Sequence, residues 1–394
     1  MALPQTSSFW TRMGCGEDDQ ARDVCIEAIR RLYGEGYDVK EFTEQGWCSY
    51  TLLVSQRPTG TLEPTKRDLE ELKESTAIVQ IRPQRHSFDL DIAQEARATY
   101  GNLAPTFHHL PVSLPSNLAA FAMNVLPGVA LSSKIPLNPV DTTPIAKRIK
   151  LISSLAITLA RAWPPSPSSY SSSSPLPPTQ KHHLRADSPL SLSSPSNPSW
   201  LTPCHGRVGS QIVPKLLKLA TSLPSLALRA RATQTLDAFL VVREDYPLVL
   251  NHGDLIPTNI LVDAETWEVK GLVDWAEAEV LPFGVCAGYG VEWCLGGLVT
   301  STPTSPTSTP PNDTKAWKVF QYSPDADFLR EVFWKEMVRE RPQIEERLEE
   351  VRIMGDVGVL LWHGFAWDEG RIDRVVEYGR DEGDVACLEA FLGV

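Results

Sequence analysis

The sequence predicts an α+β protein built as two lobes, with a small β-rich lobe before a larger and mostly helical one. Its length of 394 residues exceeds that of one ordinary domain and suits two packed lobes. Short apolar runs that stop at turn residues are frequent up to residue 126, and longer segments with helical apolar spacing follow. We therefore expect a first lobe over residues 1–123 and a second lobe over residues 124–394.

Composition excludes several other classes of protein. Hydrophobic residues make up 42% and charged residues 22%, as in ordinary globular proteins, and the net charge of −12 disfavours a nucleic-acid partner. No apolar run approaches the ~18–20 residues of a membrane span, and the first residues lack the pattern of a secretory signal. The seven cysteines are scattered and show no zinc-ligand spacing. We expect a cytoplasmic protein with reduced thiols, no membrane contact and no structural metal, whose oligomeric state is open.

In the first lobe, helical and extended patterns alternate. Apolar residues recur at helical spacing over residues 19–33. The run Asp91–Gln94 fits a capping box, so a second helix should begin there and end at Gly101. Apolar runs that end at turn residues predict strands over residues 46–54, 76–82 and 117–126.

The second lobe contains two segments with the composition of disordered chain. The Ser/Pro-rich stretch at 164–200 and a shorter one at 300–312 hold too little apolar surface to fold, so both are expected to be disordered insertions. Periodic patterns continue on either side of them. They predict helices over 145–163, over 211–243 with a break near Pro224, and over most of 325–394, and short strands at 248–250, 260–262 and 269–273.

The most informative run is LVLNHGDLIPTNILVDAETWEVKGLVDW, over residues 248–275. His252, Gly253 and Asp254 are followed by Asn259 five residues later and by Asp274 twenty residues later. Phosphoryl transfer needs a hydroxyl held in line and cations held against phosphate oxygens. An Asp can orient a hydroxyl, and an Asn and a second Asp on a short hairpin can bind Mg²⁺ through hard oxygen ligands.

These residues resemble the aminoglycoside phosphotransferase and choline kinase family, a branch of the protein-kinase-like fold. The catalytic loop of that family is HGDxxxxN, and its metal-binding strand ends in D-W or a close variant; this chain has HGDLIPTN and VDW. The resemblance implies that Asp254 is the catalytic base, that His252 shapes the loop, and that Asn259 and Asp274 bind Mg²⁺. It further implies ATP, or alternatively GTP, as the phosphoryl donor and a small-molecule hydroxyl as the acceptor. The Ser/Pro-rich insertions are similar to those of filamentous-fungal members.

The strand residue that binds phosphate in this family is usually Lys, and here the sequence departs from the pattern. The strand TAIVQIRP contains no Lys, but Gln80 and Arg82 are two residues apart and point to the same face. Arg82 keeps the positive charge and is the preferred candidate, whereas Gln80 in that place would weaken phosphate binding. Glu95, on the first-lobe helix, is the expected partner of this residue, with a solvated surface carboxylate as the alternative.

Two further nucleotide contacts are implied by the resemblance. Gly46 and Ser49 occupy the place of the glycine-rich loop, although a single Gly is present and a plain β-turn explains it equally well. Met123, Asn124 and Val125 resemble the hinge whose backbone holds adenine, and the alternative is a buried strand that enters a turn.

The acceptor is not specified by these motifs. Glu277 and Glu279 follow the metal strand and either line the acceptor side, support the metal or face water. Residues 317–394 carry 18 acidic and 10 basic side chains, which would favour a cationic, amine-bearing acceptor but equally fits a solvated helical surface. Because the strand Lys is missing, a catalytically silent kinase-like protein that binds a nucleotide or another ligand is the competing hypothesis.

Overall fold

The computed structural model describes residues 9–10, 18–43, 45–46, 48–57, 76–115, 117–135, 143–165, 197–301, 317–368 and 371–394. The chain divides into two units. Unit 1 comprises Met1–Ala130, Asn259–Asp263 and Lys270–Glu277, and unit 2 comprises Leu131–Thr258, Ala264–Val269 and Ala278–Val394. Unit 1 thus takes in the expected first lobe together with later segments, and the division into lobes at Met123 stays a proposal.

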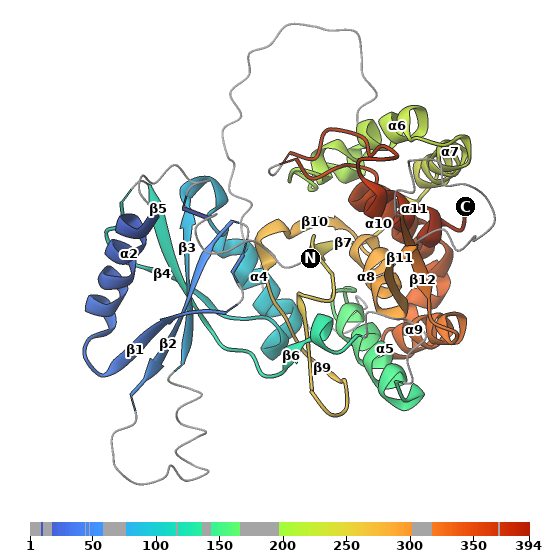
Figure 1. Ribbon diagram of the computed structural model, residues 1–394. Helices are drawn as coiled ribbons and strands as arrows, with labels where there is room; N and C mark the ends of the chain where they lie inside the picture. The colour runs from blue at the N-terminus through green and yellow to red at the C-terminus, as the bar shows by residue number, and fades with distance from the viewer. Residues whose placement is uncertain are drawn as a thin grey trace, which may run out of the picture. The chain divides into compact units, whose positions relative to one another are not determined.

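Unit 1 is built on a five-stranded antiparallel sheet with the strand order β1-β2-β3-β5-β4 (Figure 1). The predicted strands at 46–54, 76–82 and 117–126 are confirmed as β2, β3 and β5, although β2 begins four residues later than expected. The two edge strands, β1 and β4, were not predicted. The strands are β1 (Tyr37–Glu41), β2 (Tyr50–Gln56), β3 (Ala77–Pro83), β4 (Phe107–Leu110) and β5 (Leu118–Asn124), and the helices are α2 (Asp18–Tyr33) and α4 (Leu90–Tyr100).

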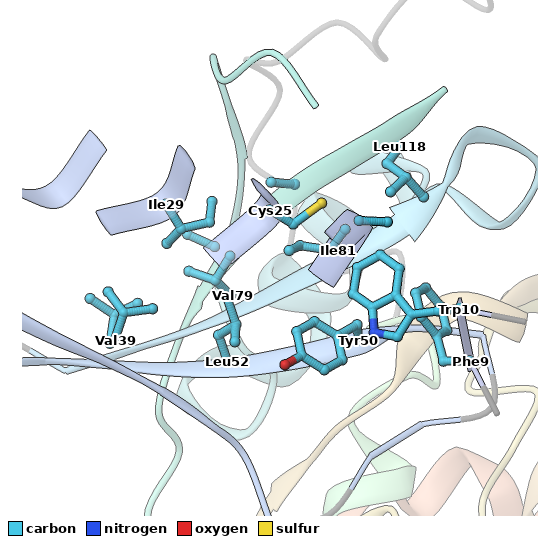
Figure 2. Close-up of a cluster of buried hydrophobic side chains, with 14 residues drawn as sticks. Phe9, Trp10, Cys25, Ile29, Val39, Tyr50, Leu52, Val79, Ile81 and Leu118 are labelled. Carbon is cyan, nitrogen blue, oxygen red and sulfur yellow. The ribbon is translucent and has the colours of Figure 1, made fainter. Parts of the chain in front are cut away.

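The alternation of side chains along β3 gives the sheet two different faces. Val79 and Ile81 are fully buried in a large apolar cluster with residues of α2, β1, β2 and β5 (Figure 2). On this face Trp10 packs against Tyr50, with ring centroids 4.9 Å apart. The opposite face carries Gln80 and the buried Arg82 together with Ile78, which packs against a second apolar cluster of Phe88, Phe121 and Met123.

Helix α4 starts earlier than the sequence pattern suggested. Asp89 is its N-cap, because the Asp89 carboxylate accepts hydrogen bonds from the backbone N–H groups of Asp91 and Ile92. The predicted capping box at Asp91 is therefore wrong by two residues. The predicted end is confirmed, since Gly101 is the C-cap and has the positive φ of 59° that glycine tolerates best.

Unit 2 is mostly helical (Figure 1). The helix predicted over 145–163 and the broken helix predicted over 211–243 are confirmed, with the break at residues 223–225. The prediction that most of 325–394 is helical is confirmed by α9, α10 and α11, and the antiparallel pair of β11 and β12 was not predicted. The helices are α5 (Ile145–Ala160), α6 (Ile212–Ser222), α7 (Leu226–Leu240), α8 (Val285–Leu295), α9 (Ala326–Glu340), α10 (Leu348–His363) and α11 (Glu382–Leu392).

Three small sheets complete the part of the fold that the structure describes. Strand β7 (Leu248–Asn251) pairs antiparallel with β10 (Glu279–Pro282), and β11 (Gly296–Ser301) pairs with β12 (Trp317–Tyr322). The third sheet has the order β6-β8-β9. Its strands are β6 (Val129–Ala130), β8 (Ile260–Val262) and β9 (Val269–Leu272), so the strands predicted at 248–250, 260–262 and 269–273 are confirmed.

An antiparallel sheet in the N-terminal part followed by helices in the C-terminal part is the α+β kinase-like fold that the sequence predicts. Within the described ranges, no helix is long and apolar enough to cross a membrane. The two predicted insertions fall mainly on residues 166–196 and 302–316, which lie outside the described residues.

Candidate active site

The HGD loop follows directly from β7 in unit 2. The His252 side chain is buried, and its Nδ1 accepts a hydrogen bond from the backbone N–H of Asp254 at 3.3 Å. An accepting Nδ1 requires the neutral imidazole with its proton on Nε2. Gly253, between them, has a φ of 75°, a left-handed conformation that a side chain would strain. His252 therefore hydrogen-bonds within the turn that carries Asp254, and its role in shaping a catalytic loop stays a prediction.

The hairpin of β8 and β9 brings Asn259 and Asp274 to the same end of the small sheet in unit 1. The backbone N–H of Val273 donates to the carbonyl of Asn259 at 3.0 Å, which places Asp274 one residue beyond a direct strand pair. Asn259 is buried, whereas the side chain of Asp274 is 45% exposed. Asp274 also has a φ of 62°, a costly conformation for a non-glycine residue.

Trp275 holds the end of this hairpin in place. Its indole Nε1–H donates to the carbonyl of Leu272 at 2.9 Å, and its ring packs on Tyr100 of α4 with centroids 5.1 Å apart. The side chain is 2% exposed, so this aromatic residue belongs to the core of unit 1. The buried contact fixes the backbone next to Asp274.

Arg82 lies at the centre of a polar cluster on the face of β3 that carries Gln80. Its Nη2 is 3.3 Å from Oδ1 of Asp274, and its Nε donates to the side-chain oxygen of Gln80 at 3.0 Å. The guanidinium carbon lies 3.9 Å from the ring centroid of Phe88, and Nη1 contacts the carbonyl of His86 at 3.4 Å. The structure thus brings together three of the sequence candidates, namely Gln80, Arg82 and Asp274.

Glu95 does not join this cluster. It lies on α4, and it forms no ion pair with any described residue. A large part of the residue is exposed, yet desolvation by the surrounding chain raises the pKa of its carboxyl above the ordinary value. Asp274 is the carboxylate that pairs with Arg82 in this structure, and the pairing of Glu95 with Arg82 stays a prediction.

Gly46 and Ser49 lie in the connection between β1 and β2. Ser49 is buried and Gly46 is exposed, and a Cβ on Gly46 would lie only 2.7 Å from Oγ of Ser49. The neighbouring Gln45 spans the connection: its Nε2 donates to the carbonyls of Phe42 and Thr51, and its Oε1 accepts from the N–H of Thr51 at 2.8 Å. These hydrogen bonds of Gln45 could not be predicted, because an isolated Gln carries no motif.

The three hinge candidates lie where β5 ends. Met123 is buried against Phe88 and Phe121, and Asn124 uses its Oδ1 to accept hydrogen bonds from the N–H and hydroxyl of Thr106 at 2.7 and 2.9 Å. Val125 is 40% exposed. The side chains of Met123 and Asn124 are thus engaged within unit 1, and adenine binding by the backbone of these three residues stays a prediction.

Glu277 and Glu279, the two glutamates that follow Asp274, differ in their hydrogen-bond partners. The carboxylate of Glu279 accepts hydrogen bonds from the backbone N–H groups of Val208 and Gly209 at 2.9–3.1 Å, and it fits against Gly206. Glu279 therefore stabilises the loop before α6, and its carboxylate is already hydrogen-bonded within the protein. Glu277 lies half-buried in the short turn Trp275–Glu277, and its role stays a prediction.

The oxygen donors of Asn259 and Asp274 fit a Mg²⁺ ion that arrives with nucleotide phosphates, because such an ion needs only one or two protein oxygen ligands. Among the described residues, no group of three or more His, Cys, Asp or Glu side chains could hold a metal ion by itself. Of Asn259 and Asp274, the residue whose oxygen ligands are accessible is Asp274, because its carboxylate is exposed.

Residues 206–284 match the model of the phosphotransferase enzyme family, APH. The matched segment is about a fifth of the chain, and it contains His252, Asp254, Asn259 and Asp274. This part of the chain is similar to the phosphotransferase family over the residues that carry the resemblance. No match to the chain is found among the curated proteins.

Solved structures of aminoglycoside phosphotransferases are distantly similar. One is a thermostable mutant of APH(4)-Ia in a ternary complex with AMP-PNP and hygromycin B; it is 12% identical, with 94% of this chain and 97% of that chain covered and a TM-score of 0.46. Another is APH(3'')-Id from Streptomyces rimosus ATCC10970 in complex with ADP and streptomycin. It is 11% identical, with 85% of this chain and 97% of that chain covered and a TM-score of 0.39.

Proposed function

We propose that this protein is a phosphotransferase that moves the γ-phosphoryl group of ATP to a hydroxyl group of a small molecule. The observation that carries the proposal is the HGDLIPTN loop together with the hairpin that returns Asp274 beside Asn259. The match of residues 206–284 to the phosphotransferase family supports the same class of reaction. Filamentous-fungal kinship and a cytoplasmic location stay proposals.

In this proposal each residue has a defined task. Asp254 accepts the hydrogen bond of the acceptor hydroxyl and orients its oxygen toward the phosphoryl group. Asn259 and Asp274 are the residues that would hold Mg²⁺, which when bound neutralises the charge on the phosphate oxygens. His252 keeps the loop in the turn that presents Asp254. Only four residues separate Asp254 from Asn259 in the chain, so one short loop carries both functions.

The phosphate contacts are proposed on the face of β3 that carries Gln80 and Arg82. Arg82 is the preferred phosphate ligand, because its guanidinium lies within reach of Asp274 and its planar donors suit phosphate oxygens. Gln80 supports the Arg82 side chain through Nε. Gly46, Ser49 and the backbone of residues 123–125 are the proposed contacts for the remaining nucleotide, and Glu95 is retained as a proposed partner of Arg82.

The acceptor stays open. The excess of 18 acidic over 10 basic side chains in residues 317–394 supports an amine-bearing hydroxyl compound as the first class to test. Glu279 is a weak candidate for binding such a compound, because backbone N–H groups of the protein already occupy its carboxylate.

A catalytically silent protein that binds a nucleotide or another ligand is the second candidate. It is favoured by two observations, namely that TAIVQIRP lacks Lys and that its buried Arg82 already pairs with Asp274. If this pair persisted with nucleotide present, the metal ligand would remain neutralised and turnover would fail.

Product formation separates the two candidates. We would incubate the protein with MgATP and a panel of sugars, amino alcohols, aminoglycosides and hydroxyl amino acids, and follow ADP release and phosphorylated product. The phosphotransferase proposal expects acceptor-dependent ADP release that Asp254→Ala abolishes while nucleotide affinity is largely kept. Turnover by Asp254→Ala equal to that of the wild type would contradict the role of Asp254. Nucleotide binding without product from any acceptor class would favour the silent protein.

A further inference from the structure

Helix α8 is hydrogen-bonded to the end of β7, the strand that leads into the HGD loop. Asn251, the last residue of β7, is 2% exposed, and its Oδ1 accepts a hydrogen bond from the backbone N–H of Cys286 in the first turn of α8 at 3.0 Å. Its Nδ2 donates to the carbonyls of Val249 at 3.0 Å and Leu281 at 3.1 Å, with Pro282 as a third, longer contact. One side chain therefore ties β7, β10 and the start of α8 together.

The same helix is also hydrogen-bonded to the chain on the C-terminal side of Asp254. The hydroxyl oxygen of Tyr289 accepts a hydrogen bond from the backbone N–H of Leu255 at 3.4 Å, and the side chain is 2% exposed. Burial raises the pKa of this phenol well above the ordinary value, so it stays protonated at neutral pH. The ring stacks on Trp362 of α10, with centroids 4.9 Å apart and planes within 11°.

These contacts form a two-point attachment of the loop to one helical face. Positions 286, 289 and 290 lie on the same side of α8, because their spacing is three and four residues. Gly290 makes room for the Leu255 side chain, which a Cβ at that position would strike. Gly288 likewise lets α8 approach the backbone of Gly355 in α10. The helix that holds residues 251 and 255 is thus itself packed tightly within unit 2.

We propose that Tyr289 is a positioning residue for phosphoryl transfer, which holds the HGD loop from its C-terminal side while Asn251 holds it from the other. This inference rests on the proposed function. Residues 252–254 lie between the two attachment points, so the backbone that carries the Asp254 carboxylate has little freedom to shift. Reacting groups tolerate little displacement, since a misplacement of about 1 Å can cost on the order of 100-fold in rate.

Tyr289→Phe is the variant that tests this role. It keeps the ring on Trp362 and removes only the oxygen that accepts from Leu255. Tyr246→Phe is the matched control, because Tyr246 is another buried tyrosine of unit 2 whose hydroxyl bonds to a backbone group, the carbonyl of Phe283 at 2.8 Å. Asn251→Asp would place a carboxylate oxygen against backbone carbonyls, and it is expected to lower thermal stability as well. The test of the positioning role therefore rests on Tyr289→Phe.

The experiment measures ATP hydrolysis, with water as acceptor, and hydrogen–deuterium exchange of peptides covering residues 251–259. We expect Tyr289→Phe to lower kcat about tenfold with the KM for MgATP unchanged, and to speed exchange in these peptides. Tyr246→Phe should keep kcat within about twofold and leave that exchange unchanged, although both variants lose one buried hydrogen bond.

Two failures can be told apart. A Tyr289→Phe variant with the kcat of the wild type, or one that loses no more kcat than Tyr246→Phe, would overturn the positioning role. Wild-type protein that neither binds nor hydrolyses MgATP would instead contradict the proposed function. Unchanged exchange over residues 251–259 in Tyr289→Phe would overturn the attachment itself, whatever the activity.

Discussion

Nη2 of Arg82 lies 3.3 Å from Oδ1 of Asp274, although the two residues are 192 positions apart in the chain. The Arg82 side chain is 4% exposed, whereas that of Asp274 is 45% exposed. A buried guanidinium needs a compensating negative charge, and here the proposed metal ligand supplies it. Bound MgATP would bring both a cation for Asp274 and phosphate oxygens for Arg82, so each member of the pair would exchange one partner for another.

Arg82 is expected to contribute more to nucleotide affinity than Gln80. Arg82→Gln should weaken MgATP binding by at least about tenfold, because a charge-assisted contact to phosphate is worth roughly 1.5–3 kcal/mol. Arg82→Lys should fall between this variant and the wild type, since it keeps the charge but loses the planar fork. Calorimetric titration with a non-hydrolysable ATP analogue and Mg²⁺ measures these affinities.

Gln80→Ala is the control for that series, because it removes only the side chain that contacts Nε of Arg82. We expect a loss of affinity of less than about threefold from it. A larger loss in Gln80→Ala than in Arg82→Gln would assign the phosphate position to Gln80 and would overturn the preference for Arg82.

Glu279 is expected to matter for stability. Glu279→Gln replaces an accepting oxygen with an amide nitrogen next to the N–H groups of Val208 and Gly209, which should lower the free energy of unfolding by about 1–3 kcal/mol. Glu244→Gln, at an exposed glutamate of the same unit, should change it by less than about 0.5 kcal/mol. Urea unfolding at pH 7 compares them. A Glu279→Gln protein as stable as Glu244→Gln would contradict the fastening of this loop.

The HGD loop and its hairpin could be predicted because their information is local. His252, Asp254 and Asn259 lie within eight residues of chain, and the apolar runs on both sides fix β7, β8 and β9. The edge strands were missed for a physical reason. Strand β1 (YDVKE) has one buried residue and β4 (FHHL) has none, so neither shows the apolar alternation that marks a half-buried strand.

The supporting residues of the site could not be predicted from the sequence. Gln45, Asn251 and Glu279 act by bonding to backbone groups that are distant in sequence or in an irregular loop, and such bonds leave no periodic pattern. The one available indication was the polar Asn251 at the end of the apolar run LVL. The Arg82–Asp274 pair needs the three-dimensional fold, because nothing in either segment specifies the other.

Arg374 should make unit 2 more stable at neutral pH than in acid. It donates to the carboxylates of Asp368 at 2.8 Å and Asp381 at 2.6 Å, and these hydrogen bonds lower the pKa of both carboxyls below the ordinary value. For a lowered pKa, the added stability is complete above the unfolded value of about 3.9 and is lost as pH falls through the folded values.

Arg374→Gln should therefore lower the urea midpoint at pH 7, and its deficit relative to the wild type should shrink as the pH falls below about 4. Arg380→Gln is the control, because Arg380 is 59% exposed and lies 3.9 Å from the same Asp368. Its effect should be small throughout. A deficit for Arg374→Gln that stays constant from pH 7 to pH 3 would contradict this assignment.

The most direct test of the central claim is thermal unfolding with and without MgATP, in the wild type and in Asp274→Asn. A ligand at 100 times its dissociation constant adds about 2.7 kcal/mol, which should raise the Tm by roughly 3 °C for a protein of this size. Asp263→Asn, at the turn of the same hairpin, is the control and should keep the rise. We predict a Mg²⁺-dependent rise that Asp274→Asn loses. An equal rise in Asp274→Asn, or none in the wild type, would contradict a nucleotide site built on Asp274.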